Sequence, residues 1–299
     1  MEIFHPVDVH DHGSIRRVEG KTIVEIRGKT HLLNEPGVTC LNSDTLEGER
    51  IYQKIFLRKK IYLPDEYEQA VAENLKGRFV LVLAMNGYSS LRPQQCAAWG
   101  VQVGAYEKAC EVLLTQVTNW LRQQFPDIDV RFIHGASDIG VDKVIVHTAN
   151  TLRRTQLGFS CPEYMFYVKD DDVPVYVAPT VREYSDAFVR SSDILIAANG
   201  RLQAYRMDIQ AVFDYDKSFI PVNVLRLIST TGGPPAKNAA GQIEDAVAHF
   251  EQRVHIIGQR RLNDFGQDKW RAAILEINDV MTNICRQILP FDIGLEVVS

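Results

Sequence analysis

The sequence lacks the features that define several large protein classes. Its cysteines are scattered along 299 residues without a C-x-x-C pair, which argues against a zinc site and a disulfide framework: Cys40, Cys96, Cys110, Cys161 and Cys285. No stretch approaches the roughly 18 apolar residues of a membrane span. The polar N-terminus has no apolar signal-peptide core. We therefore expect a cytoplasmic protein that does not enter a membrane.

An excess of positive charge is also missing. The chain carries 33 basic and 38 acidic residues, for a net charge of −5. Proteins that bind the nucleic-acid backbone usually show a positive excess or a dense Lys/Arg stripe, so nucleic acid is not an expected partner. The sequence has no P-loop, and no G-x-G-x-x-G follows its first buried strand, which disfavours an ordinary ATPase or NAD site. We expect no cofactor and no metal.

The middle of the chain alternates short apolar runs with helical spacing. Continuous apolar runs are typical of strands buried on both faces, and we expect four at Phe79–Met85, Val130–Ile133, Asp193–Ala198 and Phe219–Val224. Two further strands are expected at Tyr164–Val168 and Val175–Ala178. A β-α-β-α order implies parallel pairing with right-handed crossovers. The predicted fold class is therefore α/β, a Rossmann-like parallel sheet with helices on both faces.

Composition changes along the chain suggest three regions. Residues 1–76 are predicted to form a small β-rich N-terminal extension, residues 77–255 a Rossmann-like nucleotide-binding domain, and residues 256–299 a C-terminal helical segment. An apolar stripe on a helix over Asp268–Leu289 is typical of a core face or a dimer interface. The acidic run Asp170–Asp172 is interpreted as a solvated hairpin tip.

Glycine-rich and hydroxyl-rich loops follow the predicted strands. In an open parallel sheet, ligands bind beyond the carboxyl ends of the strands. Glycine lets the backbone approach a ligand, and a helix N-terminus after such a loop suits a phosphate. The candidate ligand-binding residues in these loops are Gly87, Ser89, Ser90, Arg92, Gly104, Gly135, Ser137, Gly140, Asn199, Gly200, Arg201, Thr231, Gly232 and Gly233.

Each single loop has an alternative interpretation, because a loop can do no more than turn a strand into a helix. Four such loops gather at one sheet edge and favour a ligand site for a nucleotide or another phosphate-bearing metabolite: 86–104, 134–142, 199–201 and 230–235. If the glycines serve the ligand, bulky replacements of Gly135 or Gly140 should weaken binding and leave the fold mostly intact. Asp142 is expected in the first turn of its helix, where the helix dipole stabilises a carboxylate. A capping role and a ligand-binding role are therefore both open for Asp142.

Two segments carry a resemblance to known families. The segment Arg131–Asp142 is similar to the "SGxAxGID" segment of the DNA-processing protein A family and to the equivalent loop of the LONELY GUY family, long called "lysine decarboxylase-like". The segment Ser192–Asp208 lies where LONELY GUY proteins carry "PGGxGTxxE". Both families belong to the SLOG superfamily of Rossmann-like proteins. The resemblance covers about residues 78–236 and implies a nucleotide-type ligand.

The departures from the LONELY GUY pattern bear on activity. LONELY GUY enzymes hydrolyse the N-glycosidic bond of cytokinin nucleoside monophosphates with a glutamate at the position of Arg206, and Asn199-Gly200 stands for the glycine pair. An arginine suits anion binding instead. The resemblance thus implies a nucleotide-binding sensor or scaffold of the SLOG type. The alternative is an N-glycosidic-bond hydrolase that uses Asp208 or Asp142 as its catalytic carboxylate, so enzymatic activity stays open. LONELY GUY enzymes are commonly dimers, which implies a homodimer.

Overall fold

The computed structural model describes residues 14–18, 21–26, 29–33, 41–43, 52–54, 59–89, 91–168, 171–200, 208–231 and 267–288. Of the residues before 59, only the course of the strands is described. Within all these ranges, no helix has both the length and the apolar character needed to cross a membrane.

A seven-stranded sheet forms the centre of the molecule, and every neighbouring pair in it is parallel. The order across the sheet is β12-β11-β7-β8-β9-β10-β6. The four expected core strands are confirmed as β7, β8, β11 and β12, and their parallel pairing is confirmed too. The strands are β6 (Ile61–Tyr62), β7 (Val80–Gly87), β8 (Asp129–His134), β9 (Gln156–Ser160), β10 (Val175–Val177), β11 (Ile194–Ala198) and β12 (Ser218–Val222).

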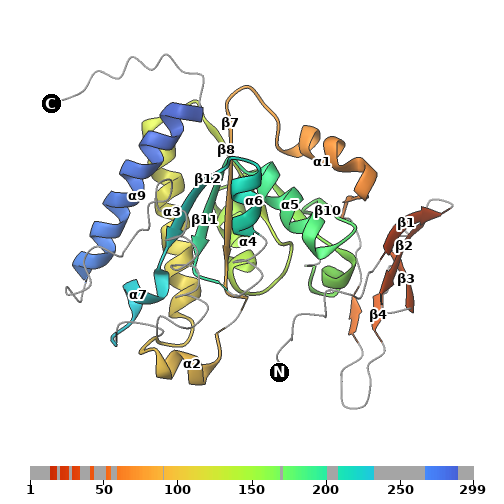
Figure 1. The fold of residues 1–299 in the computed structure, drawn as a ribbon, viewed down its shortest axis with the longest axis horizontal. Coiled ribbons are helices and arrows are strands. Elements are labelled where there is room, and N and C mark those ends of the chain that lie inside the picture. Colours follow the sequence, from red (N-terminus) through yellow and green to blue (C-terminus); the bar gives the residue numbers. More distant parts are fainter. Residues whose placement is uncertain are drawn as a thin grey trace.

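Helices cover both faces of this sheet, as the sequence predicts. Figure 1 shows α3 and α9 on one side of the strands and α1 and α5 on the other. The α-helices are α1 (Tyr67–Asn74), α2 (Pro93–Ala98), α3 (Ala105–Gln124), α4 (Gly140–Thr151), α5 (Val181–Ser191), α6 (Ile209–Asp214), α7 (Val224–Ile228) and α9 (Gln267–Ile288). Two short 3-10 helices are η1 (Pro64–Glu66) and η2 (Pro162–Tyr167).

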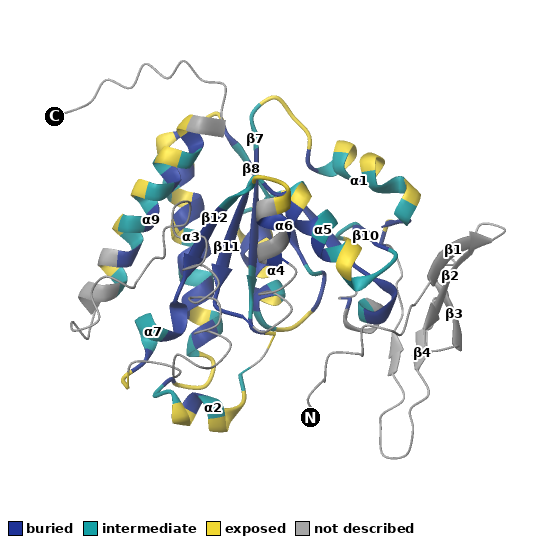
Figure 2. Cartoon of the chain, viewed as in Figure 1, coloured by how far each residue is buried: buried dark blue, intermediate teal, exposed yellow. Residues whose placement is uncertain are grey.

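The two faces of the sheet bury two separate apolar clusters. Along β7, Leu81, Leu83 and Met85 point into the cluster shared with α3, α4, α7 and α9. Val82 and Ala84 alternate with them and pack toward α1, α5 and α6. Figure 2 shows the central strands almost wholly buried between the helices. This burial on both sides explains why the strands read as unbroken apolar runs.

The apolar stripe of α9 packs inside its own domain. Ala273, Ile277, Met281 and Cys285 are buried in the cluster of α3 and α4, with Trp270 partly buried beside them. The stripe therefore has a partner within the chain, and the core interpretation of this helix is confirmed. The homodimer stays a prediction that α9 does not support.

The N-terminal segment forms two small antiparallel sheets, which agrees with a β-rich extension. The first contains β1 (Ser14–Val18), β2 (Lys21–Ile26) and β3 (Lys29–Leu33), and the second pairs β4 (Leu41–Ser43) with β5 (Tyr52–Lys54). β6 belongs instead to the central sheet, where it pairs with β10. The sheet therefore includes a strand that precedes residue 77, the expected start of the Rossmann-like domain.

Three local expectations are wrong. The expected strand at Tyr164–Val168 is largely the 3-10 helix η2, because Pro162 suits a first helical position, and the strand β9 lies before it. Val224 begins α7 rather than ending β12, since the Asn223 side chain accepts a hydrogen bond from Arg226 N at 3.1 Å and caps the helix. Asp171 is no solvated tip: its carboxylate pairs with the buried Lys59 ammonium at 2.5 Å.

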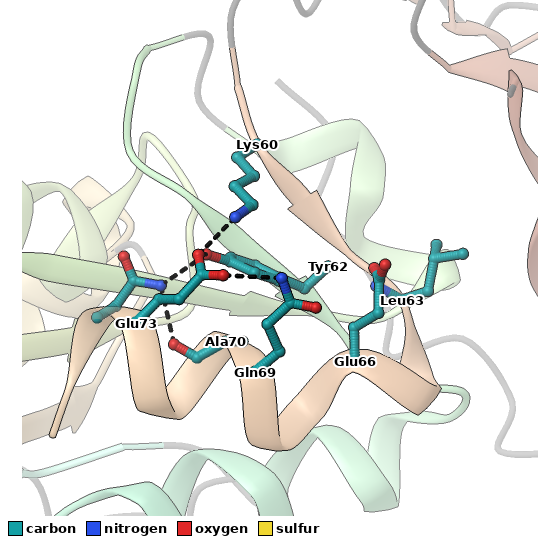
Figure 3. Close-up of polar contacts among 8 residues, drawn as sticks. Lys60, Tyr62, Leu63, Glu66, Gln69, Ala70 and Glu73 are labelled. Carbon is teal, nitrogen blue, oxygen red and sulfur yellow. Dashed lines mark hydrogen bonds and ion pairs between the residues drawn. The ribbon is translucent and has the colours of Figure 1, made fainter.

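A polar network holds α1 against the edge strand β6 (Figure 3). One Glu73 carboxylate oxygen accepts from Lys60 Nζ at 2.5 Å and from the Tyr62 hydroxyl at 2.6 Å. The other oxygen accepts from Gln69 Nε2 at 2.7 Å. These hydrogen bonds lower the pKa of Glu73 to about 2, and the one from Lys60 contributes most to this shift. Charged side chains at an edge also discourage pairing with another chain.

Replacing Glu73 with glutamine is expected to weaken this attachment slightly at neutral pH, because solvent screens an exposed ion pair. The folded-state pKa of Glu73 lies below its ordinary value of 4.5. The stabilisation is therefore complete above that value and is lost as the pH falls toward about 2. Urea unfolding at several pH values, in a double-mutant cycle with Lys60→Met, measures it. A difference between wild type and Glu73→Gln that does not shrink in acid would contradict this assignment.

Candidate functional site at the carboxyl edge

The order of the strands places a topological switch point beside β7. From β7 the chain proceeds through β8, β9 and β10 on one side, and then returns to place β11 and β12 on the other. Ligands of open α/β sheets bind where this reversal occurs, beyond the carboxyl ends of the strands. Two non-glycine residues here, Ala136 after β8 and Asn199 after β11, have positive φ angles of 59° and 61°. Such backbone strain is frequent at functional sites.

A tyrosine fills the crevice directly between β7 and β11. The buried Tyr106 hydroxyl donates to the Ala198 carbonyl at the end of β11 and accepts from Tyr88 N at 3.0 Å. A side chain on Gly87 would overlap this hydroxyl and would lie 2.6 Å from the Val141 side chain. Burial raises the pKa of Tyr106 well above its ordinary value, so the hydroxyl stays a donor. Gly87 therefore packs against protein, and Tyr106 occupies the switch-point crevice itself.

The loop after β8 is fastened to the first turn of α4 by Asp142. Its carboxylate accepts from Gly135 N at 2.7 Å and from the Ser137 hydroxyl at 2.6 Å, one bond to each oxygen. Burial raises the pKa of Asp142, and the hydrogen bonds from Ser137 and Gly135 oppose that rise. Both oxygens of Asp142 thus have partners within the loop.

Gly140 and Gly135 are held in close contact with other parts of the site. Gly140 has a φ of +53°, and a Cβ there would lie 2.5 Å from Ser89 Cα and Ser89 O, and closer still to the Tyr88 carbonyl. A Cβ on Gly135 would lie 2.5 Å from an Asp142 oxygen. The expectation that bulky replacements leave the fold mostly intact is therefore wrong, because these glycines allow the loops to pack.

A second buried carboxylate lies on the α5–α6 side of the sheet. Asp208, at the start of α6, accepts a hydrogen bond from Asn86 Nδ2 at 2.9 Å. Burial raises the pKa of Asp208 to about 6, in spite of lowering by Asn86 and Ser185, and the negative charges of Asp142 and Asp186 raise it further. Asn86 continues the face of Val82 and Ala84 along β7, so it points toward α5 and α6.

Tyr184 of α5 completes the cluster. A Cβ placed on Gly135 would lie 2.8 Å from the Tyr184 hydroxyl, so this hydroxyl lies beside the loop that Asp142 holds. Burial, together with the negative charges of Asp142 and Asp208, raises the pKa of Tyr184 well above its ordinary value. Tyr164 packs edge-on against the Tyr184 ring, and Phe188 stacks on it. Asn86, Asp142, Tyr184 and Asp208 come from four different elements and are hereafter the acid cluster.

Sequence reasoning named both carboxylates of the acid cluster, placed Asn86 in a candidate loop without giving it a role, and missed Tyr184. One signal could have found Asn86, since Val80, Val82, Ala84 and Asn86 share one face of a buried strand and only Asn86 is polar. Tyr184 carries no such signal, because its helix is amphipathic and a tyrosine suits its inner face.

The remaining predicted ligand residues lie apart from the acid cluster or are used by the fold. Asn199 supports α7: its Nδ2 donates to Asn223 Oδ1 at 3.0 Å, and its Oδ1 accepts from Leu225 N at 2.9 Å. Gly200 is buried beside it. Four others are exposed around the same edge: Ser89, Arg92, Gly104 and Thr231. Ser90, Arg201, Arg206, Gly232 and Gly233 lie outside the described residues.

Among the residues that the structure describes, no three His, Cys, Asp or Glu side chains gather as metal ligands. The free cysteines Cys96, Cys110, Cys161 and Cys285 are all buried.

Comparisons with known proteins return structural matches alone. No family model matches the sequence, and no curated protein matches it. Among solved structures, the molybdenum cofactor carrier protein of Chlamydomonas reinhardtii aligns with 12% identity and a TM-score of 0.44, over 68% of this chain and 98% of that one. The molybdenum cofactor binding protein of Rippkaea orientalis aligns with 13% identity and a TM-score of 0.43, over 69% and 98%. Similarity at this level carries no information about ligand or activity; the Rossmann-like α/β fold follows from the sheet itself.

Proposed function

We propose that this chain is a ligand-binding protein of the SLOG type, a sensor or scaffold that binds a nucleotide or nucleotide-derived metabolite at the carboxyl edge of its sheet. The acid cluster is the observation that carries the proposal. Four polar side chains from β7, α4, α5 and the start of α6 converge beside the switch point, where α/β proteins bind ligands.

The energetics of the acid cluster also favour a functional role. A buried carboxylate is costly unless it is paired, and its pKa rises as a result. Asp208 keeps that cost, since its pKa stays at about 6 although the hydrogen bonds from Asn86 and Ser185 lower it. Groups with perturbed pKa values in clefts are candidates for functional sites. A fold selected for stability alone would gain by an uncharged side chain at this position.

A thermal-shift screen tests the proposal directly. We expect one or more nucleotides or sugar phosphates to raise the unfolding temperature, because a ligand at 100 times its Kd stabilises the folded state by about 2.7 kcal/mol. Asp127→Asn provides a matched control for Asp208→Asn, since Asp127 is exposed just before β8, at the opposite edge of the sheet. The control should keep the full shift and Asp208→Asn should change it. A screen in which no nucleotide or sugar phosphate shifts the transition would count against the proposal.

One observation favours a second function, hydrolysis of an N-glycosidic bond. A carboxyl group with a pKa of about 6 can exchange a proton near neutral pH, as general acid–base catalysis requires. A carboxylate there could also stabilise the positive charge that develops on the sugar. An assay for free base and ribose phosphate, with Asp208→Asn beside wild type, separates the two functions. Turnover by wild type that is lost in Asp208→Asn would establish the hydrolase.

A further inference from the structure

The hydrogen-bonding capacity left over in the Asn86–Asp208 pair is of one kind. Asn86 Oδ1 is buried and has no hydrogen-bond partner among the described residues, while its Nδ2 donates to one Asp208 oxygen. An ionised carboxylate only accepts, so it fixes the amide with its NH2 group toward Asp208 and its oxygen away. The free capacity of the pair consists of acceptors: Asn86 Oδ1 and the Asp208 lone pairs that neither Asn86 nor Ser185 uses. A missing partner must therefore supply donors.

We propose that Asn86 and Asp208 together recognise a hydrogen-bond-donating part of the ligand, either a ribose diol or an amino-bearing edge of the base, and that the phosphate lies away from them. This inference rests on the proposed function, because it assigns one part of the same site. It makes the pair determinants of ligand specificity and orientation.

Charge and geometry disfavour a phosphate beside the Asn86–Asp208 pair. The carboxylates of Asp142 and Asp208 both lie near this position, and a phosphate would add a third negative group that offers acceptors where donors are needed. The nearby N-terminus of α4 is also engaged: Val141 N donates to the Tyr88 carbonyl at 3.3 Å, and Gly140 packs on Ser89. In the crevice between β7 and β11, the Tyr106 hydroxyl occupies the space beside Gly87. The α5–α6 side therefore suits the donor end of a nucleotide and disfavours its phosphate.

Binding measurements on the purified full chain test the inference. The probes are the four ribonucleoside 5′-monophosphates, ribose 5-phosphate and inorganic phosphate, measured by calorimetry against wild type, Asp208→Asn and the control Asp127→Asn. A hydrogen bond to a charged group lost from a buried site weakens binding about tenfold or more. We expect that loss for the bound nucleotide in Asp208→Asn and none in Asp127→Asn. Thermal unfolding of each variant confirms that it is folded.

Analogues then identify the donor. Two analogues of the nucleotide that binds are compared. One is its 2′,3′-dideoxy form, and the other is the same nucleotide with a base that lacks the exocyclic amino group. The analogue whose affinity is the same in wild type and Asp208→Asn lacks the donor that faces Asp208.

Two results would overturn the inference in distinguishable ways. Equal or tighter nucleotide binding by Asp208→Asn would refute it and leave the proposed function standing, since tighter binding is the result expected if the phosphate faced the carboxylate. Absence of nucleotide and sugar-phosphate binding to wild type would refute the proposed function and this inference with it.

Discussion

Replacement of Gly140 with alanine is expected to lower the free energy of unfolding by about 2–5 kcal/mol. Two costs add. A non-glycine residue with positive φ costs about 1–2 kcal/mol, and the φ of Gly140 is +53°. The added Cβ would also lie 2.5 Å from Ser89 backbone atoms. Backbone on both sides leaves no flexible group to move, and overpacking of this kind typically costs a further ~1–3 kcal/mol.

Gly104 gives a matched control within the same chain. It lies directly before α3, and its φ is +81°, but nothing lies within 4 Å of a Cβ placed there. Alanine at Gly104 should therefore cost only the backbone strain of about 1–2 kcal/mol. Urea unfolding of the two variants, with the slope of the transition checked for constancy, gives the comparison. Equal losses at the two glycines would show that Gly140 does not pack on Tyr88 and Ser89 as described.

Replacement of Asp208 with asparagine is expected to stabilise the folded protein at neutral pH, by about 3 kcal/mol. Burial holds the folded-state pKa at about 6, above the ordinary value of 3.8. The folded state therefore binds the proton more tightly than the unfolded state between these values, and wild-type stability falls as the pH rises through them. The amide has no charge to bury, and it can still accept from Asn86 Nδ2. The advantage of Asp208→Asn should be small below pH 3.8 and complete above about pH 6.

Unfolding free energies at pH 4, 5, 6 and 7.5 measure this difference, with Asp127→Asn as the control that should follow wild type. The same substitution is expected to weaken nucleotide binding, so one side chain would lower stability and support function, as functional residues often do. If Asp208→Asn were less stable than wild type at pH 7.5, the carboxylate would have a strong partner that this account omits.

The fold was largely predictable because burial on both faces leaves a direct trace in sequence. Runs such as Phe79–Met85 are apolar without alternation, and helical spacing separates them, so strands, helices and parallel pairing follow together. β9 was missed because its five residues include Gln156, Gly158 and Ser160, which do not read as a buried strand. The adjacent aromatic residues of η2 supplied a false strand signal.

The candidate site was only partly predictable. Glycine-rich loops pointed to the carboxyl edge of the sheet, because they mark where strands end. Sequence patterns do not show which glycines contact protein, and Gly140 and Gly87 turned out to pack on Ser89 and Tyr106. Nor do they show long-range pairs such as Asn86 and Asp208, which meet only when the start of α6 comes close to the carboxyl end of β7.

A crystal structure of the protein with the ribonucleoside monophosphate that stabilises it most would test the central claim most directly. We predict density for the nucleotide on the α5–α6 side of the carboxyl edge, with a ribose hydroxyl or a base amino group within hydrogen-bond distance of Asn86 Oδ1 and Asp208. The phosphate should lie away from both carboxylates. A nucleotide bound at the amino edge of the sheet, or one with its phosphate against Asp208, would contradict the account.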